Sequence, residues 1–249
     1  GNSTYSLKQT PRSSKLPPRA WTCGVFSFPQ SWYNRSMILN FFGNQFFKFQ
    51  VGDTVLATDP FSKESDFKAA KFGADVVLQS TLHEDMSGGA DLFYGTKTPN
   101  LVKGPGEYEI SNIFIKGYGA YTGYGEINHE SGTTYYTFEF DGIRVVFLGA
   151  LGKDEAKNDK KFLAIEGDVD MLFIPVSGEG RLTPKQAAEY VNNLEPKIVV
   201  PMGFSDVKDA NLQSFVKEIG DSTAETVDKL TIKKKEVDAC AQKLYIIKP

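Results

Sequence analysis

The side chains best suited to chemistry lie in two short segments of the sequence. Residues 80–86 follow the apolar, β-branched run of residues 76–78, and Asp59 ends another run of strand type. Functional groups often stand where the strands of an open sheet end. Of the side chains in these segments, Asp59, His83 and Asp85 could ligate a metal ion, and three ligands of mixed type predict at most a single-ion site.

Two other interpretations of residues 80–86 need no metal. Ser80 or Thr81 could serve as a nucleophile, with His83 as its base and Asp85 orienting the imidazole. Three such residues within six positions of one loop seldom reach that geometry. The simpler interpretation makes His83 a hydrogen-bonded loop residue and Asp85 the cap of the following turn.

The histidine count restricts metal chemistry further. The chain has two histidines, His83 and His129, whereas a dinuclear zinc centre of the common hydrolase kind uses several imidazoles. We therefore expect no dinuclear zinc centre and no resident cofactor. The two cysteines, Cys23 and Cys240, form neither a four-thiolate zinc site nor a disulfide framework. His129 falls in a polar stretch and is expected in an exposed loop.

The elements that position these residues are predicted to be strands in the first part of the chain. The 249 residues are 41% hydrophobic and 13% aromatic, which favours a β-rich or mixed domain with a normal core. Alternation and turn residues such as Asp141-Gly142 predict hairpins. The expected strands are residues 38–42, 45–51, 54–58, 76–78, 100–103, 107–110, 112–117, 133–140 and 143–148.

Helices are predicted in the second part. Residues 171–176 and 198–201 are of the buried-strand type. Thr183 and Pro184 indicate the start of a helix that extends to about residue 194, and a helix over residues 209–219 ends at Gly220. Hairpins followed by strand–helix–strand units predict a mixed sheet sandwich covered by helices.

The charge distribution separates residues 1–36 from residues 37–249. Five of the 28 basic residues and none of the 31 acidic ones lie in residues 1–36, so residues 37–249 carry 23 basic and 31 acidic side chains, a net charge of −8. We interpret residues 1–36 as a basic, acid-free extension, with an organelle transit peptide as the alternative. The acidic remainder argues against nucleic-acid binding.

Other features of the composition concern membranes and compartment. No run of about 18 apolar residues indicates a membrane span. The low cysteine content favours a reducing compartment, and we expect the cytoplasm.

The order of several segments resembles the metallo-β-lactamase superfamily, and within it the branch of metal-dependent hydrolases that includes ascorbate-6-phosphate lactonase-like proteins. The similarity covers about 200 residues from Met37 onward. It implies an α/β (α+β) fold, the αββα sandwich of two mixed sheets flanked by helices, with the site at one sheet edge. The matching segments are residues 43–47, 58–61, 104–109, 147–149 and 194–202.

The same resemblance implies that most metal ligands are replaced. The superfamily signature His-x-His-x-Asp-His falls on Thr81, His83, Asp85 and Met86, so two of its four ligands are present. The resemblance places the other ligand positions, and an accessory histidine, at Thr122, Ala150, Gly203 and Asn44. Thr, Met, Ala and Gly do not replace imidazole or carboxylate at zinc.

Three functional hypotheses follow. The first is a catalytically inactive member of the fold that binds a small molecule or a protein, with a vestigial pocket formed by Asn44, Asp59, Thr81, His83, Asp85, Met86, Thr122, Ala150 and Gly203. The second is a metal-dependent hydrolase of esters, lactones or phosphodiesters that uses a single-metal or shifted site at Asp59, His83 and Asp85. The third is a structural or assembly subunit, homo-oligomers included, in which Trp21 and Trp32 of the extension contact a partner.

Overall fold

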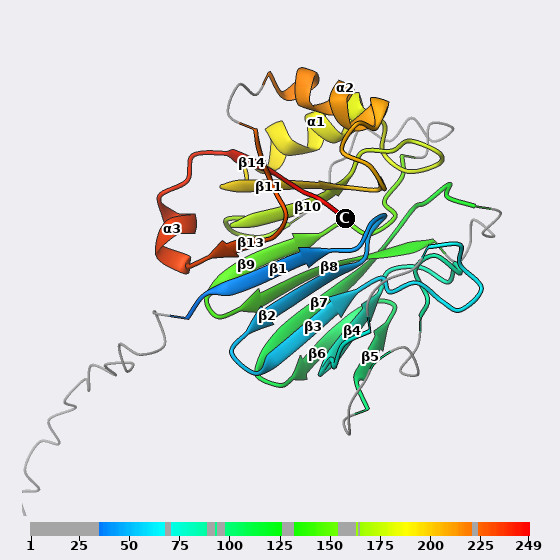
Figure 1. Ribbon diagram of the computed structural model, residues 1–249, viewed down its shortest axis with the longest axis vertical. Helices are drawn as coiled ribbons and strands as arrows, with labels where there is room; N and C mark the ends of the chain where they lie inside the picture. Colours follow the sequence, from blue (N-terminus) through cyan, green and yellow to red (C-terminus); the bar gives the residue numbers. More distant parts are fainter. Residues whose placement is uncertain are drawn as a thin grey trace, which may run out of the picture.

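Two β-sheets lie face to face and form the body of the protein (Figure 1). The computed structural model describes residues 35–67, 71–88, 93, 98–125, 132–153, 163, 165–220 and 224–249. Both sheets combine parallel and antiparallel pairs, so the predicted sandwich of two mixed sheets is confirmed. The expectations for Trp21, Cys23, Trp32 and His129, and for residues 1–34 of the extension, lie outside the described residues.

The first sheet has six strands in the order β13-β1-β2-β3-β4-β5. Strands β1 to β3 are antiparallel neighbours, while β4 and β5 continue the sheet in parallel with β3. The bounds are β1 (Met37–Phe41), β2 (Phe47–Val51), β3 (Thr54–Thr58), β4 (Val76–Gln79), β5 (Asn100–Lys103) and β13 (Leu230–Ile232).

The second sheet has eight strands in the order β12-β14-β11-β10-β9-β8-β7-β6. Strands β6 to β9 form an antiparallel meander, and β9, β10, β11, β14 and β12 are parallel. The bounds are β6 (Gly106–Ile110), β7 (Ile113–Ala120), β8 (Thr133–Phe140), β9 (Ile143–Phe147), β10 (Met171–Pro175), β11 (Ile198–Met202), β12 (Glu225–Val227) and β14 (Lys243–Ile247).

Aromatic side chains fill the space between the sheets. The ring of Phe47 meets that of Phe173 edge-on at 4.9 Å, and the ring of Phe49 meets that of Phe138 at 5.4 Å. Because side chains alternate along a strand, β3 directs Val55 and Ala57 to the opposite face. There they pack with phenylalanines that include Phe46. Among the described residues, loop side chains such as Phe61 and Phe67 cover this outer face.

Helices α1 (Pro184–Leu194) and α2 (Ala210–Ile219) lie together over the outer face of the eight-stranded sheet (Figure 1). The helix start predicted at Thr183 is confirmed, because its side chain accepts a hydrogen bond from the Gln186 backbone N–H, and the Gln186 side chain accepts one from the Thr183 backbone N–H. The predicted end of α2 is also confirmed, with Gly220 in the left-handed conformation. In the part of the chain that the structure describes, no helix is both long and apolar enough to cross a membrane.

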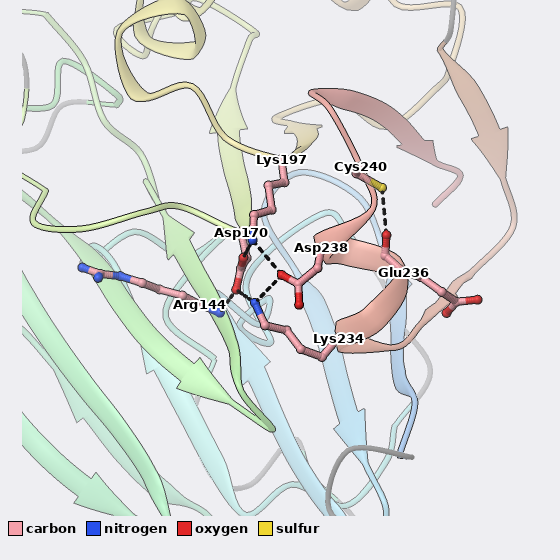
Figure 2. Close-up of polar contacts among 7 residues, drawn as sticks. All are labelled: Arg144, Asp170, Lys197, Lys234, Glu236, Asp238 and Cys240. Atoms are coloured by element: carbon pink, nitrogen blue, oxygen red, sulfur yellow. Dashed lines mark hydrogen bonds and ion pairs between the residues drawn. The ribbon is translucent and has the colours of Figure 1, made fainter.

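Sequence patterns did not predict β12, β13, β14 or the short helix α3 (Lys234–Asp238). Helix α3 is held by the buried carboxylate of Asp170. This carboxylate accepts hydrogen bonds from Lys197 Nζ and from Lys234 Nζ of α3, each at 2.7 Å (Figure 2). The backbone N–H of Arg144 in β9 donates to the same carboxylate at 2.9 Å. Both lysines also reach Asp238. Asp170, which directly precedes β10, therefore connects α3 to β9 and to the start of β10.

Candidate functional site

The sequence-predicted residues gather at the edge where strands of both sheets end. Asp59 follows β3, Ser80 follows β4 and Gly203 follows β11. The two sheets are joined there by hydrogen bonds, because the Gln45 side chain donates to the Gly149 carbonyl at 2.9 Å and the Asn44 N–H donates to the Phe204 carbonyl at 2.8 Å. The structure thus places these residues at one sheet edge, and their function as a site stays a prediction.

Asp59 is completely buried and already hydrogen-bonded. One carboxylate oxygen accepts the Ser80 backbone N–H at 2.6 Å, and the other accepts the Ser80 hydroxyl at 2.7 Å. Burial raises the pKa of the Asp59 carboxyl to about 7, although the Ser80 hydrogen bonds and the positive charge of Arg181 act in the opposite direction. Ser80 therefore serves as the partner of this carboxylate.

Asp85 is engaged in the same way. Its Oδ1 accepts the hydroxyl of Ser65 at 2.5 Å, and its Oδ2 accepts the hydroxyl of Tyr124 at 2.9 Å. Burial raises the pKa of Tyr124 to about 12, and the hydrogen bond to Asp85 contributes. Asp85 thus connects the loop after β4 to the loop after β7.

His83 lies beside this pair. Its Nδ1 accepts the backbone N–H of Asp85 at 3.2 Å and lies 3.6 Å from Asp85 Oδ2, while its ring meets that of Tyr124 edge-on at 4.8 Å. The hydroxyl of Thr81 instead donates to the Gly132 carbonyl at 3.3 Å. With Ser80 bonded to Asp59, the structure does not assemble a Ser/Thr–His83–Asp85 triad.

Arg181 is a buried cation at the centre of the site, and its side chain is 3% exposed. Its Nη1 donates to Asn44 Oδ1 at 2.5 Å, and its guanidinium lies over the Tyr124 ring at 4.2 Å. Its Nη2 lies 3.7 Å from the carboxylate of Glu179, which is exposed. Burial lowers the pKa of Arg181, while Tyr124, Glu179, Asp85 and Asp59 act to raise it.

Of the remaining predicted pocket residues, Met86, Thr122 and Ala150 are buried and Gly203 is half-buried. Met86 and Ala150 are fully buried, and Thr122 accepts the Tyr124 N–H at 3.1 Å. Gly203 has a φ of +94°, and a Cβ built there would lie 2.9 Å from Ser177 Oγ and 3.6 Å from Arg181 Nη1. A larger residue at Gly203 would therefore meet both backbone strain and occupied space.

The donor atoms available to a metal ion are consequently limited. Both oxygens of Asp59 and both oxygens of Asp85 accept hydrogen bonds, and His83 Nδ1 accepts one as well. Within the described ranges, the structure brings together no group of three or more His, Cys, Asp or Glu side chains that could hold a metal ion.

Sequence reasoning missed Arg181 and Tyr124. Arginine is rarely fully buried, and Arg181 contacts Asn44, which is 137 positions away in the chain. No local pattern marks that contact. Gly178 and Gly180, shortly before Arg181, are typical of a loop, but they do not indicate which way its side chains point.

Comparisons with known proteins agree with the fold. A family model described as a beta-lactamase superfamily domain matches residues 38–203. The chain is 24% identical to a UPF0173 metal-dependent hydrolase of Lysinibacillus sphaericus, over 68% of this chain and 86% of that protein. It is 26% identical to a UPF0173 metal-dependent hydrolase of Thermococcus onnurineus, over 74% and 92%.

A solved structure shows the same similarity. The crystal structure assigned to a Zn-dependent hydrolase of the metallo-beta-lactamase superfamily from Thermotoga maritima aligns with 85% of this chain and 98% of its own. The TM-score is 0.63 and the sequence identity is 25%.

Proposed function

Given that this chain belongs to the beta-lactamase superfamily, whose domain model it matches over residues 38–203, we propose that it is a catalytically inactive member. In this proposal the dinuclear metal site of hydrolase relatives has been lost, and the retained fold acts as a ligand-binding or interaction module. Both changes concern the edge of the sandwich that carries Asp59, His83 and Asp85.

The observation that carries the proposal is that the surviving candidate ligands are bonded to the protein itself. A carboxylate binds a metal through its oxygen lone pairs. Both oxygens of Asp59 accept hydrogen bonds from Ser80, and those of Asp85 accept hydrogen bonds from Ser65 and Tyr124. A metal would have to bind the remaining lone pairs beside these hydrogen bonds or break them, and each hydrogen bond broken at a buried donor costs about 1–3 kcal/mol.

The positions that the resemblance assigns to further ligands support the same conclusion. The side chains of Ala150 and Gly203 offer no donor atom, and a Cβ at Gly203 would lie only 2.9 Å from Ser177 Oγ, with Arg181 Nη1 in contact at 3.6 Å. A buried guanidinium close to the carboxylates also repels a second cation. The residues present do not fit a two-metal centre, and the proposal includes no hydrolytic step.

The loop that carries His83 offers a contact for a binding partner. Leu82 is 72% exposed, more than any other large hydrophobic side chain among the described residues. The nature of the ligand, the ascorbate-6-phosphate lactonase-like branch and the cytoplasmic compartment stay predictions.

A metal-dependent hydrolase remains the second candidate. The two relatives described above match this chain over most of their length, and both are named metal-dependent hydrolases. It would use a single ion at Asp59, His83 and Asp85. That candidate requires a metal to share or displace the hydrogen bonds of both carboxylates described above.

Thermal unfolding with and without metal tests the proposal. A ligand that binds only the folded state raises the midpoint of unfolding by mass action. We expect zinc to leave both midpoints unchanged. The full chain should unfold at one temperature in excess chelator and in excess zinc, and the His83→Ala variant should likewise keep its own midpoint in both. A zinc-dependent rise in the midpoint of the wild type that is lost in His83→Ala would overturn the proposal in favour of the hydrolase.

A further inference from the structure

We infer that Arg181 is the resident cation of this site, so that its guanidinium supplies inside the fold the positive charge that bound metal ions supply in a metallo-hydrolase. The inference rests on the proposed function and gives it a physical cause. It explains how the carboxylates retained at the sheet edge remain compatible with a folded protein.

The position of the guanidinium is the first argument. Two of the positions at which the resemblance expects histidines are Asn44 and Gly203. Arg181 Nη1 donates to Asn44 Oδ1 at 2.5 Å and lies 3.6 Å from the point where a Cβ of residue 203 would stand. The cation therefore occupies space that side chains at these two positions would share with a metal.

The charges around the guanidinium are the second argument. Asp85 reaches it through Tyr124, whose hydroxyl donates to Asp85 and whose ring lies under the guanidinium. The exposed carboxylate of Glu179 lies 3.7 Å from Arg181 Nη2, and the buried side of the site adds weaker electrostatic interactions of Arg181 with Asp85 and Asp59. A buried ion without a partner of opposite charge is strongly destabilising, so the cation and the carboxylates stabilise one another.

The backbone around Arg181 is the third argument, because it is shaped to admit this loop. The Gly180 carbonyl accepts the Gly123 N–H at 2.8 Å. A Cβ at Gly180 would lie 2.0 Å from the carbonyl carbon of Gly123, and one at Gly152 would lie 2.3 Å from the Gly180 oxygen. Three glycines let the loop approach closely enough for Arg181 to enter the site.

A double-mutant cycle between Arg181 and Asp85 tests the inference. The full chain, Arg181→Met, Asp85→Asn and the double variant are compared by urea denaturation. If the two charges balance one another, the double variant will be more stable than the sum of the single effects predicts, by about tenfold or more in the unfolding equilibrium constant. Additive effects would overturn the inference.

A matched control uses a carboxylate elsewhere in the fold. Asp141, in the turn between β8 and β9, pairs with Arg35. In the cycle of Arg181→Met with Asp141→Asn, the effects on the unfolding equilibrium constant are expected to be additive within about twofold. Equal coupling in both cycles would show a general effect of charge and would also overturn the inference.

The cycle remains decisive if Arg181→Met does not fold. The readout is then the recovery of folded protein, and a folded Arg181→Met/Asp85→Asn double variant supports the inference, whereas a double variant as unfolded as the single one contradicts it. Failure of the inference is distinct from failure of the proposed function, because zinc that stabilises the wild type would refute the latter whatever the cycle shows.

Discussion

Arg181 Nη1 donates a hydrogen bond of 2.5 Å to Asn44 Oδ1, which joins the loop before α1 to the turn between β1 and β2. Both residues are buried, and the bond crosses the edge at which the two sheets meet. A charged hydrogen bond in this setting fixes the direction of the guanidinium. The same bond therefore helps to hold the two sheets together and to orient Arg181 in the candidate site.

Removing the Asn44 amide should therefore destabilise the protein. Asn44 has a φ of +50°, so Asn44→Gly removes the side chain without adding backbone strain. Because it leaves a buried guanidinium short of an acceptor, we expect a loss of about 1–3 kcal/mol in the free energy of unfolding, measured in urea. Asn192→Ala, on an exposed position of α1, is the control and should change little. A variant as stable as the wild type would show that the bond contributes nothing.

Substitution of Gly203 should cost more than backbone conformation alone explains. Gly203→Ala places a Cβ 2.9 Å from Ser177 Oγ at a φ of +94°. Gly178 has a φ of +67° with nothing within 4 Å of the added Cβ, so Gly178→Ala measures the backbone strain without the contact, about 1 kcal/mol. We expect Gly203→Ala to exceed this control in chemical denaturation. Equal losses would mean that the space is not occupied.

The pH dependence of stability should carry the signature of Asp59. Burial raises the pKa of its carboxyl from 3.8 to about 7, so between these values the folded state holds a proton that the unfolded state has lost. The contribution of this group to stability therefore falls as pH rises through that window, by about 1.4 kcal/mol per pH unit. Asp59→Asn removes this dependence and should gain stability relative to the wild type as pH rises. Parallel stability–pH profiles for the two proteins would contradict the assignment.

Asp170 should act with the opposite sign. Burial alone would raise its pKa, but the hydrogen bonds from the Arg144 N–H, Lys197 and Lys234 outweigh burial and lower it (Figure 2). The stabilisation is present above the ordinary value of 3.8 and is lost as pH falls below it. We expect Asp170→Asn to cost about 1–3 kcal/mol at neutral pH and progressively less in acid.

A surface pair provides the control for Asp170. The Asp228 side chain is 87% exposed and pairs with Lys248 at 2.9 Å, and exposed pairs contribute little to stability. Asp228→Asn should therefore leave the urea midpoint nearly unchanged at every pH. A cost for Asp170→Asn as small as this one would refute the role of Asp170 in holding α3.

The sequence predicted those parts of the fold that local chemistry determines. Asp141 and Gly142 adopt the positive φ values that their hairpin requires, and Thr183 and Gly220 begin and end helices where expected. Strand β13 escaped prediction because its three residues are ordered by pairing with β1, at the opposite end of the chain.

The candidate site divides along the same line. Asp59, His83 and Asp85 could be singled out because each follows a strand or lies in one short loop. Their hydrogen-bond partners Ser65, Tyr124 and Ser80 depend on tertiary contacts, as does the burial of Arg181. Which donors satisfy a carboxylate is thus a property of the packed structure and cannot be read from spacing alone.

The measurement that tests the central claim most directly is the zinc content of the wild-type chain, purified without chelator and dialysed to equilibrium against zinc. Because the carboxylates are bonded within the protein and Arg181 supplies the charge, we predict far less than one equivalent of tightly held zinc, and the same amount in His83→Ala. One equivalent or more of tightly held zinc in the wild type, lost in His83→Ala, would contradict the account.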